Sequence, residues 1–447
     1  MKKSILFALT LSCAGAFAQE HFAGINTSRR IGLLNASINP AELANMANDH
    51  EISVFNVSAN VANNKISFGE IVSGTDFEKL IFDGGDAANL RLDVEILGPG
   101  FGMKVDKWAF AITSAAKIKA NLVEVDVILG KALTEGGTNI VEQFSQINAQ
   151  YNQRASATSW GEIGLSAARE IYDSEEHRFT GGVTFKLLFP GSYANMGADK
   201  FSGRVVNNTN EDLQLTDASA NINIAYSGSL AEGFTDSDNF TDFFAGGLNG
   251  FATDLGINYQ WKDLDSKGYK LNAGLAVRNL GSMTFKDSNN QSRNYNLNVP
   301  DGQFLDLGQF TDVEDLRELE ALLLSSPYFE AMSAQRDFKV RLPALFSGYA
   351  DYKLHNNFYV TAFTQQKLNE DSANDQIVVQ NIISVTPRYS ADIYEAYLPL
   401  AHNEISGFTA GVGFRAGGFF IGSGSVISAM LSDTNQADAY VGFRFGF

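Results

Sequence analysis

The last eight residues of the chain, Tyr440–Phe447, alternate strictly between two kinds of side chain. Because successive side chains of a β-strand point to opposite faces, this pattern predicts a strand with two different faces. One face is apolar and mostly aromatic, with Val441, Phe443, Phe445 and Phe447. The other face carries tyrosine, glycine and arginine. An apolar face of this kind has to be covered by a protein core or by lipid, and this requirement constrains the fold of the whole chain.

The other end of the chain has the composition of a secretory signal peptide. Two lysines precede an apolar run at residues 4–15, which is followed by a small-x-small cleavage pattern at residues 16–18. The run is shorter than the ~20 residues that a membrane-spanning helix needs. We therefore expect residues 1–18 to be removed after export. Cys13 is the only cysteine, so the exported chain is expected to have no disulfide, thiolate metal site or cysteine nucleophile.

The charge and composition narrow the class of protein further. The net charge is -18, and an acidic chain repels phosphate backbones, so a nucleic-acid partner is not expected. After the leader, no apolar run is long enough to span a membrane as a helix. The 41 glycines, 8 prolines and 34 phenylalanines suit strands, turns and aromatic girdles. A transmembrane β-barrel fits this composition, because its strands are only half apolar.

Segments of alternating hydrophobicity recur through the whole chain. The clearest hairpin is 250–262 with 268–285, in which apolar residues share one face of each strand. The pattern predicts an all-β fold, a transmembrane antiparallel β-barrel of about 14 strands, with an error of roughly two. A soluble periplasmic β-sandwich is the alternative, and outer faces without a continuous apolar band would favour it. The other predicted strands are 51–61, 65–72, 90–105, 107–121, 156–171, 177–190, two within 198–229, 338–354, 357–368, 376–389, 404–416, 418–431 and 437–447.

Two stretches break this rhythm and carry apolar residues at helical spacing. The first is 122–153 and the second is 312–332, which also has acidic residues in its first turn. We expect two helical insertions, acting as plugs or caps of the barrel.

A capping pattern lies just before the first predicted strand. Asn39 suits the N-cap of a short helix, Pro40 its first position, and Glu42 follows three residues after the cap. These residues require no more than an ordinary capped helix.

Three short motifs resemble FadL/PorV-like outer-membrane β-barrels of the Bacteroidota, among their uncharacterised members. They are the string from Asn39 to Ala44, the string from Arg278 to Gly281, and the closing strand. The resemblance implies that residues 19–50 form a hatch or plug-like segment with a short helix, followed by the barrel over 51–447. The implied hatch motif is Asn39, Pro40, Ala41 and Leu43, and the implied assembly signal, read by the barrel-assembly machinery, is Phe443, Phe445 and Phe447.

The sequence has no constellation that indicates an enzyme. The five histidines are not at metal-ligand spacing, and the chain has no Gly-x-Ser-x-Gly, Walker loop or His-Glu-x-x-His. Asp433, Asn435 and Asp438 could offer oxygen ligands to Ca²⁺, but chance spacing is the better interpretation in so acidic a chain. We expect no catalytic residue, no cofactor and no metal.

Two functions remain, and they predict different structures. A channel or transporter for small hydrophobic solutes predicts a continuous lumen or a side opening lined by apolar residues. A non-transporting scaffold, binding partner proteins in outer-membrane secretion or assembly, predicts a blocked lumen and a surface patch built by the two insertions. The expected location is the bacterial outer membrane. The expected partners are its lipid, the assembly machinery, and either a hydrophobic small molecule or a secretion partner protein.

Overall fold

The structure is a computed structural model. It describes residues 21–28, 30–73, 80–134, 144–207, 213–233, 237–265, 268–286, 289–310, 313, 315–431 and 434–447. The expected signal peptide, residues 1–18, lies outside this set.

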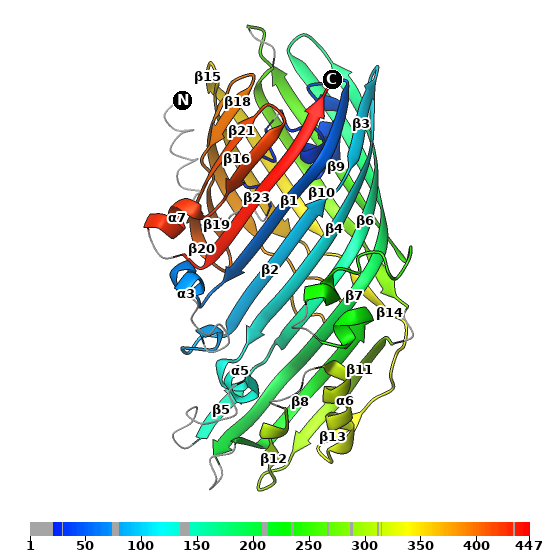
Figure 1. Ribbon diagram of the computed structural model, residues 1–447, viewed down its shortest axis with the longest axis vertical. Coiled ribbons are helices and arrows are strands. Elements are labelled where there is room, and N and C mark those ends of the chain that lie inside the picture. The colour runs from blue at the N-terminus through cyan, green and yellow to red at the C-terminus, as the bar shows by residue number, and fades with distance from the viewer. Residues whose placement is uncertain are drawn as a thin grey trace.

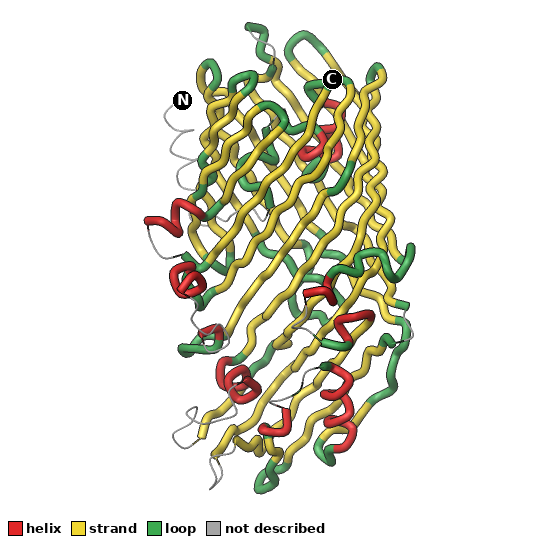
Figure 2. The backbone as a smooth tube through the Cα atoms, in the orientation of Figure 1, coloured by secondary structure: helices red, strands yellow, loops and turns green. Residues whose placement is uncertain are grey.

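Fourteen strands close into an antiparallel ring, as the sequence predicts. Four positions of the ring are each filled by two short strands in succession. The ring is closed by β23 against β1, with Phe55 opposite Phe443, so the barrel has no free edge. Figures 1 and 2 show the tilted strands. In ring order they are β1 (His50–Asn63), β2 (Ala88–Leu97) with β3 (Gly100–Val105), β4 (Trp108–Val125), β6 (Asn152–Asp173), β7 (His177–Asn207), β9 (Gly250–Lys262), β10 (Tyr269–Phe285), β14 (Phe338–Arg341) with β15 (Leu345–His355), β16 (Phe358–Lys367), β17 (Ile382–Ser390), β18 (Tyr394–Tyr397) with β19 (Leu400–Asn403), β20 (Gly407–Ala410) with β21 (Val412–Ala416), β22 (Phe419–Ser423) and β23 (Gln436–Gly446).

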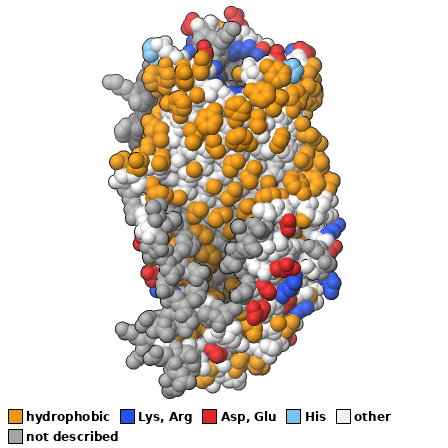
Figure 3. All heavy atoms as spheres, in the orientation of Figure 1, with side chains coloured by type: hydrophobic (Ala, Val, Ile, Leu, Met, Phe, Trp, Pro, Cys, Tyr) orange, Lys and Arg blue, Asp and Glu red, His pale blue; other side chains and the backbone are white. Residues whose placement is uncertain are grey.

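The two faces of the wall differ as they do in a barrel that crosses a lipid bilayer. On β4, Trp108, Phe110 and Ile112 point outward and are 41–50 % exposed. On the inner face, Lys119 of β4 and Asp93 of β2 form a buried ion pair. Figure 3 shows the outward apolar side chains as a broad belt. This arrangement is that of a transmembrane β-barrel of the outer-membrane type, and the continuous belt excludes a soluble sandwich. Among the described residues, no helix is both long enough and apolar enough to cross a membrane.

The two ends of the barrel are different. One end, here the turn end, carries the C-terminus and tight turns such as those at residues 106–107 and 417–418. The other, here the loop end, carries the long connections. In outer-membrane barrels the short turns face the periplasm and the long loops face outward.

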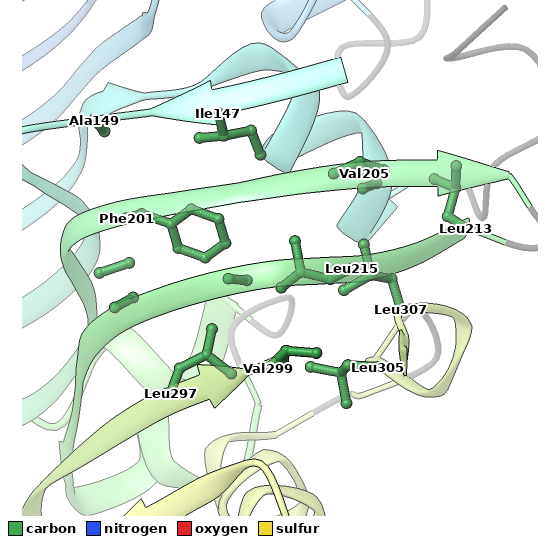
Figure 4. Close-up of a cluster of buried hydrophobic side chains, with 14 residues drawn as sticks. Ile147, Ala149, Phe201, Val205, Leu213, Leu215, Leu297, Val299, Leu305 and Leu307 are labelled. Atoms are coloured by element: carbon green, nitrogen blue, oxygen red, sulfur yellow. The ribbon is translucent and has the colours of Figure 1, made fainter. Parts of the chain in front are cut away.

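A sheet continues beyond the ring at the loop end, and we call it the extension. It arises because β7 is 31 residues long and changes partner, from β9 in its first half to β8 in its second. Figure 4 shows side chains of its core, including Phe201, Leu215 and Leu297. Besides the ends of β6 and β7, the extension contains β5 (Phe144–Asn148), β8 (Leu213–Ser227), β11 (Gln291–Val299), β12 (Leu305–Asp306), β13 (Phe329–Ala331), η2 (Gly228–Ala231), η3 (Ser237–Phe240) and η4 (Gly308–Phe310).

The predicted insertions differ in their helical content. The first contains one short helix, α5 (Val127–Thr134), because β4 runs on to Val125 and β6 begins at Asn152. Residues 144–148 form strand β5 rather than a helix, and residues 135–143 lie outside the described set. The second contains α6 (Leu316–Ser325), whose N-cap Asp315 accepts hydrogen bonds from two backbone N–H groups.

The strand predicted at 65–72 is absent, and two other predicted strands are wrong in part. Residues 68–73 form helix α3 (Phe68–Ser73), because Ser67 and Glu70 make a reciprocal capping box. The strand predicted at 418–431 ends with β22, and α7 (Val426–Leu431) follows it. The strand predicted at 376–389 begins only at Ile382, because the preceding residues fold into the loop end.

Candidate functional site

The lumen holds an N-terminal segment, residues 21–48, which we call the plug. It contains α2 (Leu33–Ala36) and η1 (Pro40–Asn45), and its residue 29 lies outside the described set. Its side chains and carbonyls contact opposite parts of the wall. Ser28 donates to Glu395 of β18 at 2.8 Å, and Tyr440 of β23 donates to the Ala23 carbonyl at 2.7 Å. Thr180 of β7 donates to the Ala41 carbonyl at 3.0 Å. The plug therefore crosses the lumen.

The structure brings the four residues of the predicted hatch motif together in η1. Asn39 is the N-cap, and its side chain accepts from the backbone N–H of Ala41 at 3.0 Å. The same side chain donates to the Ile257 carbonyl of β9 at 2.9 Å. Ala41 and Leu43 are fully buried. The cap thus joins the helix to the barrel wall as well as to its own backbone.

Three glycines of neighbouring strands make room for this motif. They are Gly182 of β7, Gly256 of β9 and Gly274 of β10. A Cβ atom at Gly182 would overlap the backbone of Pro40, and one at Gly256 or Gly274 would overlap the side chain of Asn39. The sequence pattern did not single out these glycines, although an isolated glycine within a strand often marks a close approach of another chain segment.

Glu42 connects the plug to the wall through several hydrogen bonds. It is buried, and it accepts hydrogen bonds from Asn272 at 2.7 Å, from Asn258 and Asn45 at 3.0 Å, and from the Tyr349 hydroxyl. All four donors are neutral. Burial raises the pKa of Glu42 above its ordinary value of 4.5, although these hydrogen bonds act in the opposite direction. From the sequence, Glu42 was expected only to take part in helix capping. Its place in the lumen makes it a candidate functional group.

The inner wall around the plug is charged and paired. Buried ion pairs join Arg388 to Asp351 at 2.7 Å and Lys186 to Asp254 at 2.8 Å. A cavity of about 140 Å³ remains between the plug and the wall, with polar and charged residues around much of its lining. The lumen is thus a polar environment, as the interior of such barrels usually is.

A second segment closes the loop end of the lumen. Residues 369–381, which connect β16 to β17, fold inward, and we call them the lid. The buried Arg154 of β6 donates to three lid carbonyls: Asp371 at 3.1 Å, Gln376 at 2.9 Å, and Ala373. Tyr193 of β7 donates to the Asn374 carbonyl at 2.7 Å. One buried guanidinium therefore organises most of the lid, and no sequence motif marks it.

An apolar cavity of about 470 Å³ lies on the outer face of the extension, and we call it the outer cavity. Its floor consists of outward-facing residues of β4, β6, β7 and β8, and helices α5 and α6 contribute its other walls. The lining includes Leu122, Ala157, Met196, Ile222, Leu129 and Leu319. Its volume and apolar lining are those of a small-molecule site. The two predicted insertions thus supply helices to one site.

The remaining predicted positions lie on β23 or next to it. Phe443, Phe445 and Phe447 are 39–65 % exposed at the turn end, and their recognition by the assembly machinery stays a prediction. Asp438 accepts from the Gly424 N–H and the Ser425 hydroxyl, both at 2.6 Å. Asp433 lies outside the described residues.

A family model, described as a family of unknown function (DUF5723), matches residues 40–424. No curated protein sequence matches the chain. Similar solved structures include a deltaS2S3 mutant of the monoaromatic hydrocarbon channel TodX, with TM-score 0.47 and 9 % identity over 97 % of this chain and 96 % of that one. The Ralstonia pickettii toluene transporter TbuX has TM-score 0.40 and 11 % identity over 93 % and 94 %. A Pseudomonas aeruginosa FadL homologue has TM-score 0.38 and 11 % identity over 96 % and 98 %. Since the family model spans most of its length, the chain belongs to the DUF5723 family.

Proposed function

We propose that this protein is an outer-membrane transporter that captures a small hydrophobic solute at its outer cavity and admits it when the plug and the lid move. The observation that carries the proposal is the outer cavity itself. It is large enough for a small ligand, almost wholly apolar, and situated at the end of the barrel that faces outward. Monomeric proteins rarely keep such apolar space without a ligand or partner.

The way in which the plug is held supports a removable closure. The plug bonds to the wall mainly through side chains, as at Ser28, Asn39 and Glu42. Each such bond contributes about 1–3 kcal/mol net, the higher values applying where the acceptor is a carboxylate. A segment held in this way can leave without breaking the hydrogen-bonded ladder of the barrel.

A non-transporting scaffold is the second candidate. The observation that favours it is the closure of the lumen at both ends, by the plug and by the lid. In that case the outer cavity and the extension would hold an apolar part of a partner protein.

The test is uptake of a fluorescent naphthylamine, a small hydrophobic probe, into liposomes that contain the intact protein. We expect uptake above that of protein-free liposomes, and loss of this excess in Ala157→Trp, which fills the outer cavity. Ala167→Trp is the matched control, because Ala167 lies on the outer face of the same strand, opposite Phe110 in the belt. If the intact protein takes up no more probe than empty liposomes, the transporter proposal fails and the scaffold remains.

We also propose that the barrel-assembly machinery recognises Phe443, Phe445 and Phe447 when the protein is inserted into the outer membrane. The triple alanine variant is expected to reach the outer membrane in smaller amounts, measured by fractionation. Equal amounts would contradict this assignment.

A further inference from the structure

The outer cavity is continuous with the membrane-facing surface of the barrel. On β2, Asp93 points into the lumen, so the alternate residues Leu92 and Leu90 point outward. On β4, Lys119 points inward and Ala120 and Leu122 point outward. The two strands are paired, with Leu92 opposite Ala120 and Leu90 opposite Leu122.

These outward rows are apolar along their whole course toward the loop end. They begin within the belt at Ile96 and Val94 of β2 and at Ile118 of β4, and they end at Leu90 and Leu122, which line the cavity. No charged residue interrupts either row. In Figure 3, hydrophobic side chains continue from the belt toward the lower part of the same face. A molecule dissolved in the outer leaflet therefore meets no polar barrier along these two strands.

The floor of the cavity continues the same surface across the next strands. Ala157 of β6 lies opposite Ala120, and Ala155 lies opposite Leu122. Beyond them, Met196 of β7 is opposite Ile224 of β8, and Ala198 is opposite Ile222. The small residues on β6 leave a trough, and the larger residues on β7 and β8 form its far side.

The far end of the cavity has a polar boundary. Glu320 of α6 is buried, and it accepts from the hydroxyls of Tyr226 at 2.8 Å and Tyr295 at 2.5 Å. It also pairs with Arg293 at 3.1 Å. These contacts hold α6 over the sheet. The helix offers the cavity an apolar face with Leu316, Leu319 and Leu323.

From this continuity we infer that the outer cavity takes an alkyl chain supplied sideways by the outer leaflet of the membrane. The inference rests on one part of the proposed function, the binding of a hydrophobic solute in the outer cavity. It adds the class of ligand, a bilayer-resident molecule with an alkyl chain, and the route, along the outer faces of β2 and β4. The hydrocarbon chain exchanges lipid contacts for apolar protein contacts, while its head group stays in the interfacial region.

The experiment uses two photoactivatable probes with the full-length protein in liposomes. One probe is a phospholipid with a diazirine on its acyl chain, and the other is a water-soluble octanoate with the same group. After illumination, cross-linked residues are mapped by mass spectrometry. Labelling of the belt, for example at Leu165, is an internal control for contact with the bilayer, because Leu165 is outward and 45 % exposed.

We expect the phospholipid probe to label cavity residues such as Met196 and Ile222 as well as the belt. In Ala157→Trp the labelling of the cavity should fall by about tenfold, because the indole occupies the trough. Labelling of the belt should not change. The matched Ala167→Trp variant should retain both. Circular dichroism establishes that each variant has the same strand content.

Two outcomes would overturn the inference, and they differ in what else they imply. If only the soluble octanoate labels the cavity, the lateral supply is refuted while capture of a hydrophobic solute stands. If neither probe labels the cavity although the belt is labelled, the cavity binds no such chain. The uptake assay then decides separately whether the protein transports anything.

Discussion

Glu42 places a buried carboxyl group in a segment that has to move if the lumen is to open. Burial raises its pKa in the docked plug above the value of 4.5 that it has in a solvated plug. The docked plug therefore binds the proton more tightly than the undocked plug does. The contribution of Glu42 to docking is fully present below pH 4.5 and is lost as the pH rises through the raised pKa.

We therefore predict that the plug is released more often as the pH increases through this window. Hydrogen–deuterium exchange of backbone amides at residues 31–46 should accelerate with pH beyond the intrinsic chemical increase. Glu42→Gln should remove the additional acceleration, since glutamine does not titrate. Glu70→Gln is the control, because Glu70 caps α3 away from the plug. An unchanged pH profile in Glu42→Gln would refute this role.

The three glycines opposite the hatch motif lead to a prediction about packing. Gly182→Ala should destabilise docking of the plug by ~1–3 kcal/mol, since the new methyl group overlaps the backbone of Pro40. Protease cleavage within the plug should accelerate correspondingly, while the barrel keeps its thermal stability. Gly85→Ala is the control, because a Cβ there meets no atom within 4 Å. Equal cleavage rates in the two variants would show that the plug does not need the space.

At the scale of single elements, the lid depends on Arg154. Arg154→Met removes the hydrogen bonds to Asp371, Gln376 and Ala373 while it keeps much of the side-chain volume. We expect the free energy that favours the closed lid to fall by about 3 kcal/mol, because hydrogen bonds from a charged group to buried carbonyls are among the stronger ones. Amide exchange at residues 371–377 should rise by about a hundredfold.

The control for this prediction is Arg204→Met in the extension. Arg204 is 38 % exposed and pairs with Asp301 at the surface, so its loss should change stability little. If exchange in the lid is the same in both variants, Arg154 does not hold the lid closed.

The sequence predicted the elements that depend on local patterns. Most strands of the 14-strand ring, the closing strand and the N-cap at Asn39 could be anticipated, because alternation and capping are properties of neighbouring residues. The ring strands β18 and β19 were not predicted. Helix α3 was missed although its capping box, Ser67 with Glu70, is also local. There the apolar residues that follow the turn fit a strand as well as a helix, and the pattern alone did not decide between them.

The features that form the candidate sites depend on contacts between distant residues. Arg154 meets its lid more than 200 positions away along the chain, and Glu42 meets Tyr349 more than 300 positions away. The extension depends on a change of partner along β7, which no pattern within that strand reveals. Such pairings follow from the register of the whole sheet, so a reading of local periodicity cannot supply them.

For the molecule as a whole, the plug and the lid are two closures in series along one lumen. The plug enters from the turn end and the lid folds in from the loop end, and they contact different parts of the wall. When two closures lie in series, removal of either the plug or the lid leaves the other one to block the flow of ions. Deletion of residues 19–48 alone, or Arg154→Met alone, should therefore produce little conductance in planar bilayers.

The combination of the two changes should open the lumen, with single-channel steps much larger than the sum of those of the single variants. The matched control combines the same deletion with Arg204→Met, and it should stay nearly closed. If the deletion alone conducts as well as the combination, the lid does not obstruct the path. If the combination stays closed although the barrel is folded, the charged side chains of the inner wall close the lumen by themselves. A solute would then have to leave through the wall of the barrel, or the protein would act as a scaffold.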